Sequence, residues 1–141
     1  MQKFPPLSLY VHIPWCVQKC PYCDFNSHAQ KGAIPEQEYV QHLIADLEAD
    51  LKKYQTSIQN RPLHSIFIGG GTPSLFSAKS IKLLLAEIKR RIPFSENIEI
   101  TMEANPGTVE AERFKGYVDA GVTRISMGIQ SFNDDKLQRL G

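Results

Sequence analysis

The sequence has no long apolar run, no excess of either charge and very few cysteines. Its 141 residues contain 16 Lys and Arg against 15 Asp and Glu, which leaves a formal net charge of +1. A chain this close to neutral has no electrostatic basis for binding the phosphate backbone of a nucleic acid. No apolar stretch approaches the length of a membrane span, and the first residues lack the apolar core of a signal peptide. We therefore expect no nucleic-acid partner, no integral membrane segment and a cytoplasmic location.

The three cysteines fall in one short segment, at Cys16, Cys20 and Cys23. An odd number of cysteines in a single loop is a poor disulfide framework. A C-x3-C-x2-C loop does present three thiolates close enough for three corners of a cubane 4Fe–4S cluster, which normally takes four cysteine ligands. Because one iron would stay open to a small molecule, the spacing predicts a reactive cluster rather than one that only transfers electrons.

Two other interpretations of this loop stay open from the spacing alone. One is a disulfide with a spare thiol, and the other is a zinc ion held by the three cysteines and either His12 or His28. Structural zinc sites usually combine two paired ligand hooks that lie far apart in the sequence, and no second hook is present here. The remaining features of the chain favour the cluster.

Strands and helices are expected to alternate along the chain. The apolar spacing predicts strands at residues 7–13, 64–68, 98–103 and 123–130, and helices at residues 36–54, 77–91 and 109–120. Ser77 is the expected N-cap of the second helix and Pro93 its stop, while Gly121 ends the third helix. Another helix is expected to begin just before Gly141. Alternation at this spacing predicts parallel strands joined by crossover helices.

Three of the four predicted strands alternate strictly between apolar and polar residues. Tyr10 and His12 share the polar face of the first strand, and Glu103 and Gln130 end the third and fourth strands on that same face. Parallel strands covered by helices on both faces are apolar throughout, so this polar face predicts a concave surface that binds a ligand. The strand that begins at His64 does not separate as cleanly.

A glycine-rich turn, Gly-Gly-Gly-Thr-Pro at residues 69–73, follows the second predicted strand. Ligands bind at the carboxyl ends of strands in α/β folds, and glycines let a backbone approach a ligand closely. The turn lacks the Lys-Ser/Thr ending of a phosphate-binding loop. At the same end of the sheet, the Glu103 carboxylate could accept hydrogen bonds from ribose hydroxyls or an ammonium group, and the Gln130 amide offers a donor and an acceptor. We expect His12 to be a hydrogen-bonded structural residue.

Together these motifs resemble the radical S-adenosylmethionine (SAM) superfamily, through C-x3-C-x2-C with an aromatic residue before the last cysteine, followed by Gly-Gly-Gly-Thr-Pro. The match spans Tyr10 to Gln130 and is similar to the HemN-like branch, that of the oxygen-independent coproporphyrinogen III oxidases. Within that branch the segments Tyr-x-His-Ile-Pro-Trp-Cys, Cys-Asp-Phe, Glu-Ala-Asn-Pro and Ser-Met-Gly-Ile-Gln-Ser-Phe most resemble the HemW-type heme chaperones. Two departures from the oxidases point the same way. Tyr10 follows a shorter leading segment, and Phe25 stands where the oxidases carry a further cysteine.

The resemblance implies a parallel-stranded α/β fold, a (βα)6 partial TIM-type barrel of the radical SAM kind. Residues 1–141 would be the N-terminal half or so of the core domain. The remainder of the barrel and a C-terminal domain would follow Gly141. Four strands with their helices cannot close a barrel by themselves.

The resemblance also implies roles for particular residues. Cys16, Cys20 and Cys23 match the cluster ligands. Tyr10, Gly70 and Glu103 match contacts of the SAM bound to the open iron. The matches to a second SAM in the oxidases are Tyr22, Gly71, Thr72 and Gln130.

The implied function is that of a heme chaperone that binds a 4Fe–4S cluster and SAM and delivers heme to recipient apoproteins. Heme itself would bind outside this segment. The alternative is an oxygen-independent coproporphyrinogen III oxidase. SAM cleavage is compatible with both functions, and a porphyrin would be the other partner.

Overall fold

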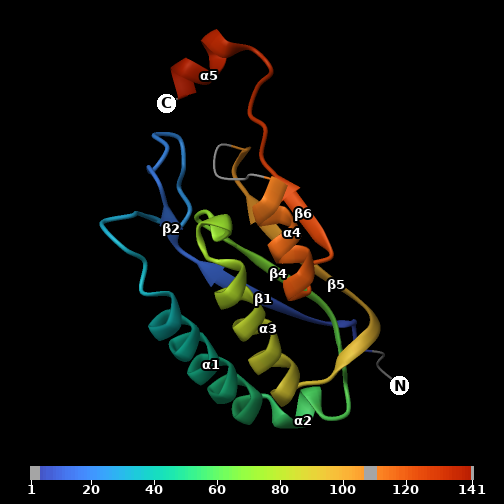
Figure 1. Ribbon diagram of the computed structural model, residues 1–141. Coiled ribbons are helices and arrows are strands. Elements are labelled where there is room, and N and C mark those ends of the chain that lie inside the picture. The colour runs from blue at the N-terminus through green and yellow to red at the C-terminus, as the bar shows by residue number, and fades with distance from the viewer. Residues whose placement is uncertain (1–3, 107–110, 141) are drawn as a thin grey trace.

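The structure is a computed structural model that describes residues 4–106 and 111–140. A parallel four-stranded sheet runs through it in the order β1-β4-β5-β6. The strands are β1 (Leu7–Ile13), β4 (Leu63–Gly70), β5 (Phe94–Ala104) and β6 (Arg124–Met127). The crossover helices are α1 (Glu36–Lys53), α3 (Ala78–Arg91) and α4 (Ala111–Ala120), and they lie on one side of the sheet (Figure 1). The predicted parallel α/β fold is confirmed.

Shorter elements fill the connections. A second, two-stranded parallel sheet pairs β2 (Trp15–Cys16) with β3 (His28–Ala29), and α2 (Gln55–Ile58) follows α1. A 3-10 turn spans Pro73–Leu75, and α5 (Asp134–Leu140) is the further helix expected near the end of the sequence. Within residues 4–106 and 111–140, none of the helices has both the length and the apolar character needed to cross a bilayer.

Most predicted boundaries lie within two residues of the observed ones, and the exceptions are the third and fourth strands. β5 begins at Phe94, four residues before the predicted start. The strand predicted at residues 123–130 is only Arg124–Met127. Its last paired residue, Met127, lies opposite Ala104, where β5 itself ends. Since no partner backbone continues past that point, residues 128–130 leave the sheet, and the prediction that Gln130 ends a strand is wrong. The predicted start of the third helix at Val109 lies outside the described residues.

The core lies between the sheet and its helices. The outward side chains of the strands are almost completely buried, as at Ile13, Ile66, Ile68 and Met102. Helix α3 contributes a buried stripe at helical spacing, namely Ile81, Leu84, Leu85 and Ile88. Burial of apolar area on this scale is the dominant stabilising term in a domain of this size.

The start of α3 is fixed by α1. Ser77 is the N-cap, and its hydroxyl accepts a hydrogen bond from the Ser80 N–H at 3.2 Å. The Glu36 carboxylate, in the first turn of α1, accepts from the Ser77 N–H at 2.8 Å and from the Ser80 hydroxyl at 2.7 Å. A carboxylate at a helix N-terminus satisfies donors that the helix cannot pair. This contact sets the position of α1 relative to the glycine turn that precedes α3.

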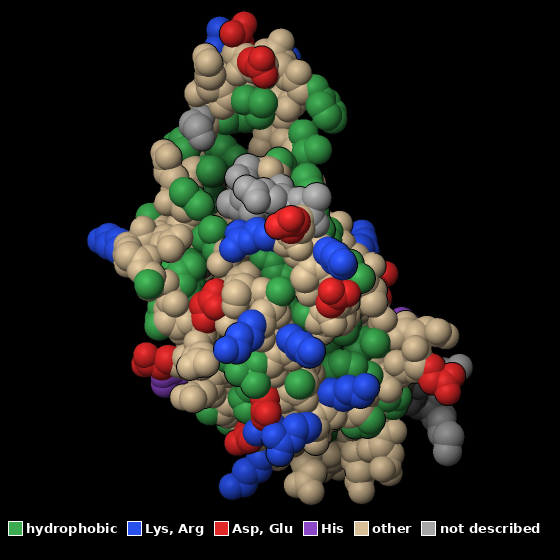
Figure 2. All heavy atoms as spheres, viewed as in Figure 1, with side chains coloured by type: hydrophobic (Ala, Val, Ile, Leu, Met, Phe, Trp, Pro, Cys, Tyr) green, Lys and Arg blue, Asp and Glu red, His purple; other side chains and the backbone are tan. Residues whose placement is uncertain are grey.

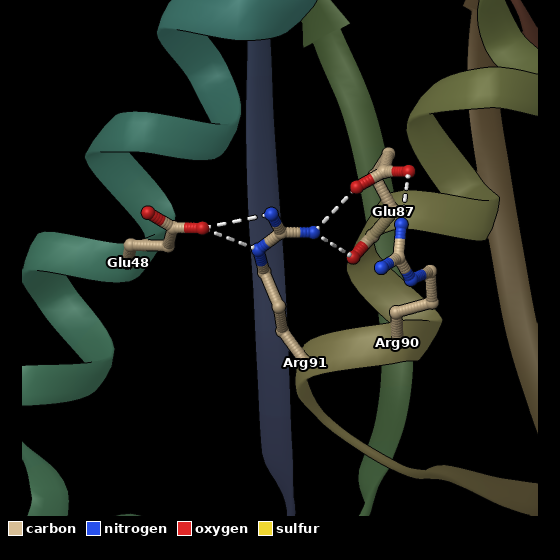
Figure 3. A network of polar contacts seen from close by, with 4 residues as sticks. All are labelled: Glu48, Glu87, Arg90 and Arg91. Atoms are coloured by element: carbon tan, nitrogen blue, oxygen red, sulfur yellow. Dashed lines mark hydrogen bonds and ion pairs between the residues drawn. The ribbon is translucent and has the colours of Figure 1, made fainter.

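Further along, an ion-pair network joins the same two helices. Arg91 of α3 bridges Glu48 of α1 at 2.7 Å and Glu87 of its own helix at 2.6 Å, while Arg90 contacts the second oxygen of Glu87 (Figure 3). Hydrogen bonding to Arg91 lowers the pKa of Glu87 below its ordinary value. Charges of both signs are scattered over this face of the molecule, where the helices meet solvent (Figure 2).

The opposite face of the sheet is built in layers. The Ser8 and Ser65 hydroxyls lie 2.8 Å apart in one layer, and the Tyr10 and Phe67 rings stack in the next, with centroids 6.3 Å apart. The register of β1 against β4 shifts at His64, which has no partner in β1. From Ser65 the strand alternates as far as Ile68, but Gly69 is buried next to it and the apolar Phe67 lies on the polar face beside Tyr10. The irregular pattern expected for this strand is therefore confirmed, at the bulge and at Phe67.

We predict that two adjacent leucines of α3 respond very differently to truncation. Leu84 is 1% exposed and Leu83 is 42% exposed. Leu84→Ala should lower the free energy of unfolding by about 3 kcal/mol, because it removes buried methyl groups and leaves a cavity. Leu83→Ala, the matched control, should change it by less than about 0.5 kcal/mol. Urea unfolding of the full-length protein measures both, and equal effects would contradict the packing described here.

Candidate functional site

A cavity of about 270 Å³ lies at the carboxyl ends of the strands, beside the loop that carries the cysteines. In Figure 1 this loop follows β1 and lies at the same end of the molecule as the tips of β4 and β6. The cavity is lined by every residue predicted for the site except Tyr10, namely Cys16, Cys20, Tyr22, Cys23, Gly70, Gly71, Thr72, Glu103 and Gln130. Residues separated by more than a hundred positions in the sequence thus meet at one place.

Tyr10 lies just outside this cavity on the same face of the sheet. Its hydroxyl is 2.8 Å from Nδ1 of His12, and its ring is 58% exposed beside Phe67. Partial burial and the nearby Glu103 carboxylate raise the pKa of Tyr10. The phenol is therefore neutral at physiological pH and able to donate a hydrogen bond.

His12 connects the first strand to the far end of the cysteine loop. Its Nε2 lies 2.7 Å from the carbonyl oxygen of Asn26. A carbonyl can only accept, so Nε2 carries the proton, and in the neutral ring Nδ1 accepts from the Tyr10 hydroxyl. His12 is therefore the hydrogen-bonded structural residue that the sequence predicted, and the loop end that it holds is a new observation.

The glycine turn packs against the chain itself. The Gly71 N–H donates to the Ile13 carbonyl at 2.8 Å, and the Thr72 N–H donates to the Trp15 carbonyl at 2.6 Å. A Cβ on Gly71 would lie 2.5 Å from that Trp15 oxygen. Gly70 has a φ of +119°, a backbone conformation that other residues rarely adopt. The glycines are thus required for a close approach to the segment that leads into Cys16.

The cysteine loop is held at its base and turns at its tip. Cys16 belongs to β2, and its carbonyl accepts from the Gln30 N–H at 2.6 Å. The Cys23 N–H donates to the Cys20 carbonyl at 3.0 Å, which forms a tight turn between those two residues. All three thiols are free and partly exposed. A hydrogen bond with Cys20 raises the pKa of Tyr22.

An aromatic cluster beneath the loop was not predicted from the sequence. The Trp15 ring meets the Tyr39 ring edge-on, with centroids 4.7 Å apart, and Phe76 lies 5.8 Å from Trp15. Tyr39, from α1, also donates its hydroxyl to the His12 carbonyl at 2.6 Å, and burial raises its pKa. Tyr39 stands in the helical stripe of α1 and Phe76 just after the glycine turn, so only the fold shows that they meet.

Glu103 and Gln130 both line the cavity, but Glu103 lies in a strand and Gln130 lies in a loop. Glu103 is in β5, and one of its carboxylate oxygens accepts from the Gly70 N–H at 3.2 Å. Gln130 lies in the exposed segment after β6. Glu103 is thus oriented by the glycine turn, while Gln130 reaches the cavity from a loop rather than from the strand that was predicted.

The donor atoms around the cavity are of the kind that an iron–sulfur cluster uses. Among the residues that the structure describes, no three His, Cys, Asp or Glu side chains are close enough to hold one metal ion. A cubane cluster is bound differently, because each thiolate binds its own iron. Cys16, Cys20 and Cys23 border one cavity, and thiolates are the ligands that such clusters use.

Comparison with known proteins supports the family resemblance that the sequence motifs indicated. The family model described as the radical SAM superfamily matches residues 10–141. The heme chaperone HemW of Haemophilus influenzae is 78% identical over the whole chain, and that of Escherichia coli K12 is 60% identical. The solved structure of E. coli coproporphyrinogen III oxidase (HemN), described as a radical SAM enzyme, superposes with a TM-score of 0.77 at 28% identity. That match covers 96% of this chain and 30% of HemN.

The chain is considerably shorter than these relatives. All of its residues align with the two HemW proteins, but they span only 37% and 36% of those proteins. The likeness therefore covers the first part of the barrel and the cysteine-bordered cavity.

We predict that the close approach at Gly71 makes this position intolerant of a side chain. Gly71→Ala should lower the free energy of unfolding by about 2 kcal/mol or more, since the new Cβ meets a backbone oxygen that cannot move aside easily. Gly32 has a positive φ but nothing within 4 Å of its Cβ position. Gly32→Ala should therefore cost only about 1 kcal/mol. Equal losses in urea unfolding would contradict the packing of the turn.

Proposed function

The chain belongs to the radical SAM superfamily, and we propose that it is the N-terminal part of the core domain of a HemW-type heme chaperone. The observation that carries this proposal is 78% identity with a protein named heme chaperone HemW over all 141 residues. Membership of the superfamily implies a 4Fe–4S cluster and SAM as cofactors. The complete protein would bind heme and deliver it to recipient apoproteins, and we assign the heme site to the part of the protein beyond residues 1–141.

We propose Cys16, Cys20 and Cys23 as the cluster ligands, one thiolate for each of three irons. Cys16 would be the rigid ligand, because its own carbonyl is hydrogen-bonded to the Gln30 N–H and the preceding Trp15 carbonyl is hydrogen-bonded to the glycine turn. Cys20 and Cys23 would close around the cluster from the turn at the loop tip. When bound, the cluster and SAM together supply one-electron reductive cleavage of a sulfonium C–S bond. The chain's own task is to hold both groups in a fixed geometry and to exclude water.

We assign Tyr10, Gly70 and Glu103 to the SAM molecule at the open iron. The Glu103 carboxylate has a second oxygen for an ammonium group or a ribose hydroxyl, while the Gly70 N–H keeps it oriented. The Tyr10 hydroxyl already donates to Nδ1 of His12, so its oxygen is left to accept a hydrogen bond from an ammonium group or a ribose hydroxyl. Gly70 and Glu103 line the same cavity as the three cysteines, and Tyr10 lies just outside it on the same face of the sheet.

A second SAM would be bound by Tyr22, Gly71, Thr72 and Gln130. The N–H groups of Gly71 and Thr72 already donate to the Ile13 and Trp15 carbonyls. The contacts open to a ligand are therefore the side chains of Tyr22 and Gln130, both of which are exposed at the cavity.

The second candidate function is that of a coproporphyrinogen III oxidase. It is favoured by the structural likeness to HemN. Phe25 opposes it, since it is 63% exposed at the edge of the cavity where the oxidases carry a further cysteine. We therefore rank the chaperone first.

Cys20→Ala should abolish cluster binding in the full-length protein. Anaerobic reconstitution of the unaltered protein should yield about four irons per chain and a charge-transfer absorbance that bleaches on reduction. Ser27→Ala is the matched control, because its hydroxyl lies 4.0 Å from the Cys23 sulfur and is not a proposed ligand. Uptake of one zinc and no iron would refute the cluster proposal.

Glu103→Gln should weaken SAM binding by about 1–3 kcal/mol, the cost of losing a buried polar contact to a charged group. The amide oxygen can still accept from Gly70, so the site keeps its shape. Glu99→Gln is the control, since Glu99 is on the same strand and face but pairs with Arg124 at 3.3 Å. Isothermal titration of the reconstituted protein with SAM checks both. An unchanged affinity in Glu103→Gln would remove this residue from the proposed site.

The choice between chaperone and oxidase is decided by two measurements on the full-length protein. We expect it to bind heme in an absorbance titration and to leave coproporphyrinogen III unconverted under anaerobic reducing conditions. Hydrogen abstraction from a propionate tolerates little misplacement of the substrate, so a chaperone site should fail this assay. Turnover at a rate comparable to a genuine oxidase run alongside would establish the second function instead.

A further inference from the structure

A groove runs along β1 on the helix-bearing side of the sheet, away from the cysteines. It consists of two cavities, of about 290 Å³ and 60 Å³, which share Leu9, Leu47 and Asp50. Its floor is apolar and is formed by leucines of both elements, namely Leu7, Leu9, Leu43, Leu47 and Leu51. We call it the β1–α1 groove. None of the residues lining it borders the cysteine cavity.

One wall of the groove is an edge strand. Within the described sheet β1 pairs with β4 alone, so one side of the strand has backbone N–H and C=O groups without a sheet partner (Figure 1). Edge strands are usually protected from further pairing by lysines, prolines or bulges. The strand Leu7–Ile13 contains neither lysine nor proline. The one register shift lies between Leu7 and Ser8, at the start of the strand, where His64 of β4 bulges. Most of the length of β1 is therefore suitable for pairing with another strand.

The part of the rim formed by α1 is acidic, while Arg61, which also lines the groove, donates to the Ser57 and Pro5 carbonyls. Asp46 and Asp50 project from consecutive turns of α1, and both are exposed. Like charges four residues apart on a helix repel each other. Among the described residues, neither carboxylate has an ion-pair partner. A ligand with positive charges at this rim would relieve the repulsion.

We propose that the β1–α1 groove binds an extended polypeptide segment of a partner protein, which adds to the sheet as a strand beside β1. Main-chain hydrogen bonds to the edge would provide affinity, and alternate side chains would provide specificity. The side chains of the bound segment that face the helices would be of two kinds. Those above the leucines of the groove would be apolar, and those opposite Asp46 and Asp50 would be basic.

The spacing of the two carboxylates matches such a strand. Residues four apart on a helix are separated by about 6 Å along its axis. Residues two apart on a strand are separated by about 6.6 Å and point to the same face. Two basic residues at positions i and i+2 of the bound segment can therefore each meet one aspartate.

The test uses the full-length protein and two labelled nine-residue peptides. The first has the sequence Thr-Val-Thr-Lys-Thr-Lys-Thr-Val-Thr. In an extended strand its two lysines therefore share one face with the two valines. In the second, both lysines are replaced by glutamate. Fluorescence anisotropy should show the lysine peptide binding roughly tenfold more tightly than the glutamate peptide, the effect of two exposed charge pairs.

Charge reversal of the rim provides the decisive variant. Asp46→Lys with Asp50→Lys should invert the preference between the peptides, whereas Glu38→Lys, elsewhere on α1, should leave it unchanged. Both changes lie on the exposed side of the helix, so circular dichroism should show an unaltered fold. Binding of neither peptide, or a preference unaffected by the reversal, would overturn the proposal.

A second copy of the chain is the competing occupant. Sedimentation velocity of the unaltered and charge-reversed proteins separates the two cases. Loss of self-association in the reversed protein, with no peptide binding in either, would identify the second copy and overturn the proposal of a separate partner. Heme binding is measured independently, so failure here leaves the proposed chaperone function untouched.

Discussion

Two backbone hydrogen bonds, from the Gly71 N–H to the Ile13 carbonyl and from the Thr72 N–H to the Trp15 carbonyl, hold the segment that leads into Cys16. They form only because a residue without a side chain lets two backbones approach to within contact distance. The same turn orients Glu103 through the Gly70 N–H. One glycine turn therefore positions both the base of the cysteine loop and the Glu103 carboxylate that lines the same cavity.

The helices support this arrangement from outside the sheet. Tyr39 of α1 packs against Trp15 and donates to the His12 carbonyl, and Glu36 of the same helix caps the start of α3. A shift of α1 would disturb the loop base and the glycine turn together. The rigid part of the site thus rests on the first turns of α1, and later turns of the same helix form one wall of the β1–α1 groove.

Much of the fold could be predicted because its signals are local. The alternation of apolar and polar residues in β1 and the Ser77 cap each depend on a few neighbouring residues. The end of β6 could not be predicted in this way, because it depends on where β5 ends. The bulge at His64 likewise reflects the register between strands rather than a local preference. The residues predicted for the site came from motifs, and all except Tyr10 line one cavity.

By itself the sequence determined the fold class, the placement of three cysteines in one loop and the polar face of the sheet, since spacing and periodicity are properties of the chain alone. Only the tertiary structure decided what the glycines approach, which aromatic rings support the loop and which strand is left at the edge. Each of these depends on side chains and backbones that are far apart in the sequence and meet only when the parallel strands pair. Packing, not local propensity, selects those contacts.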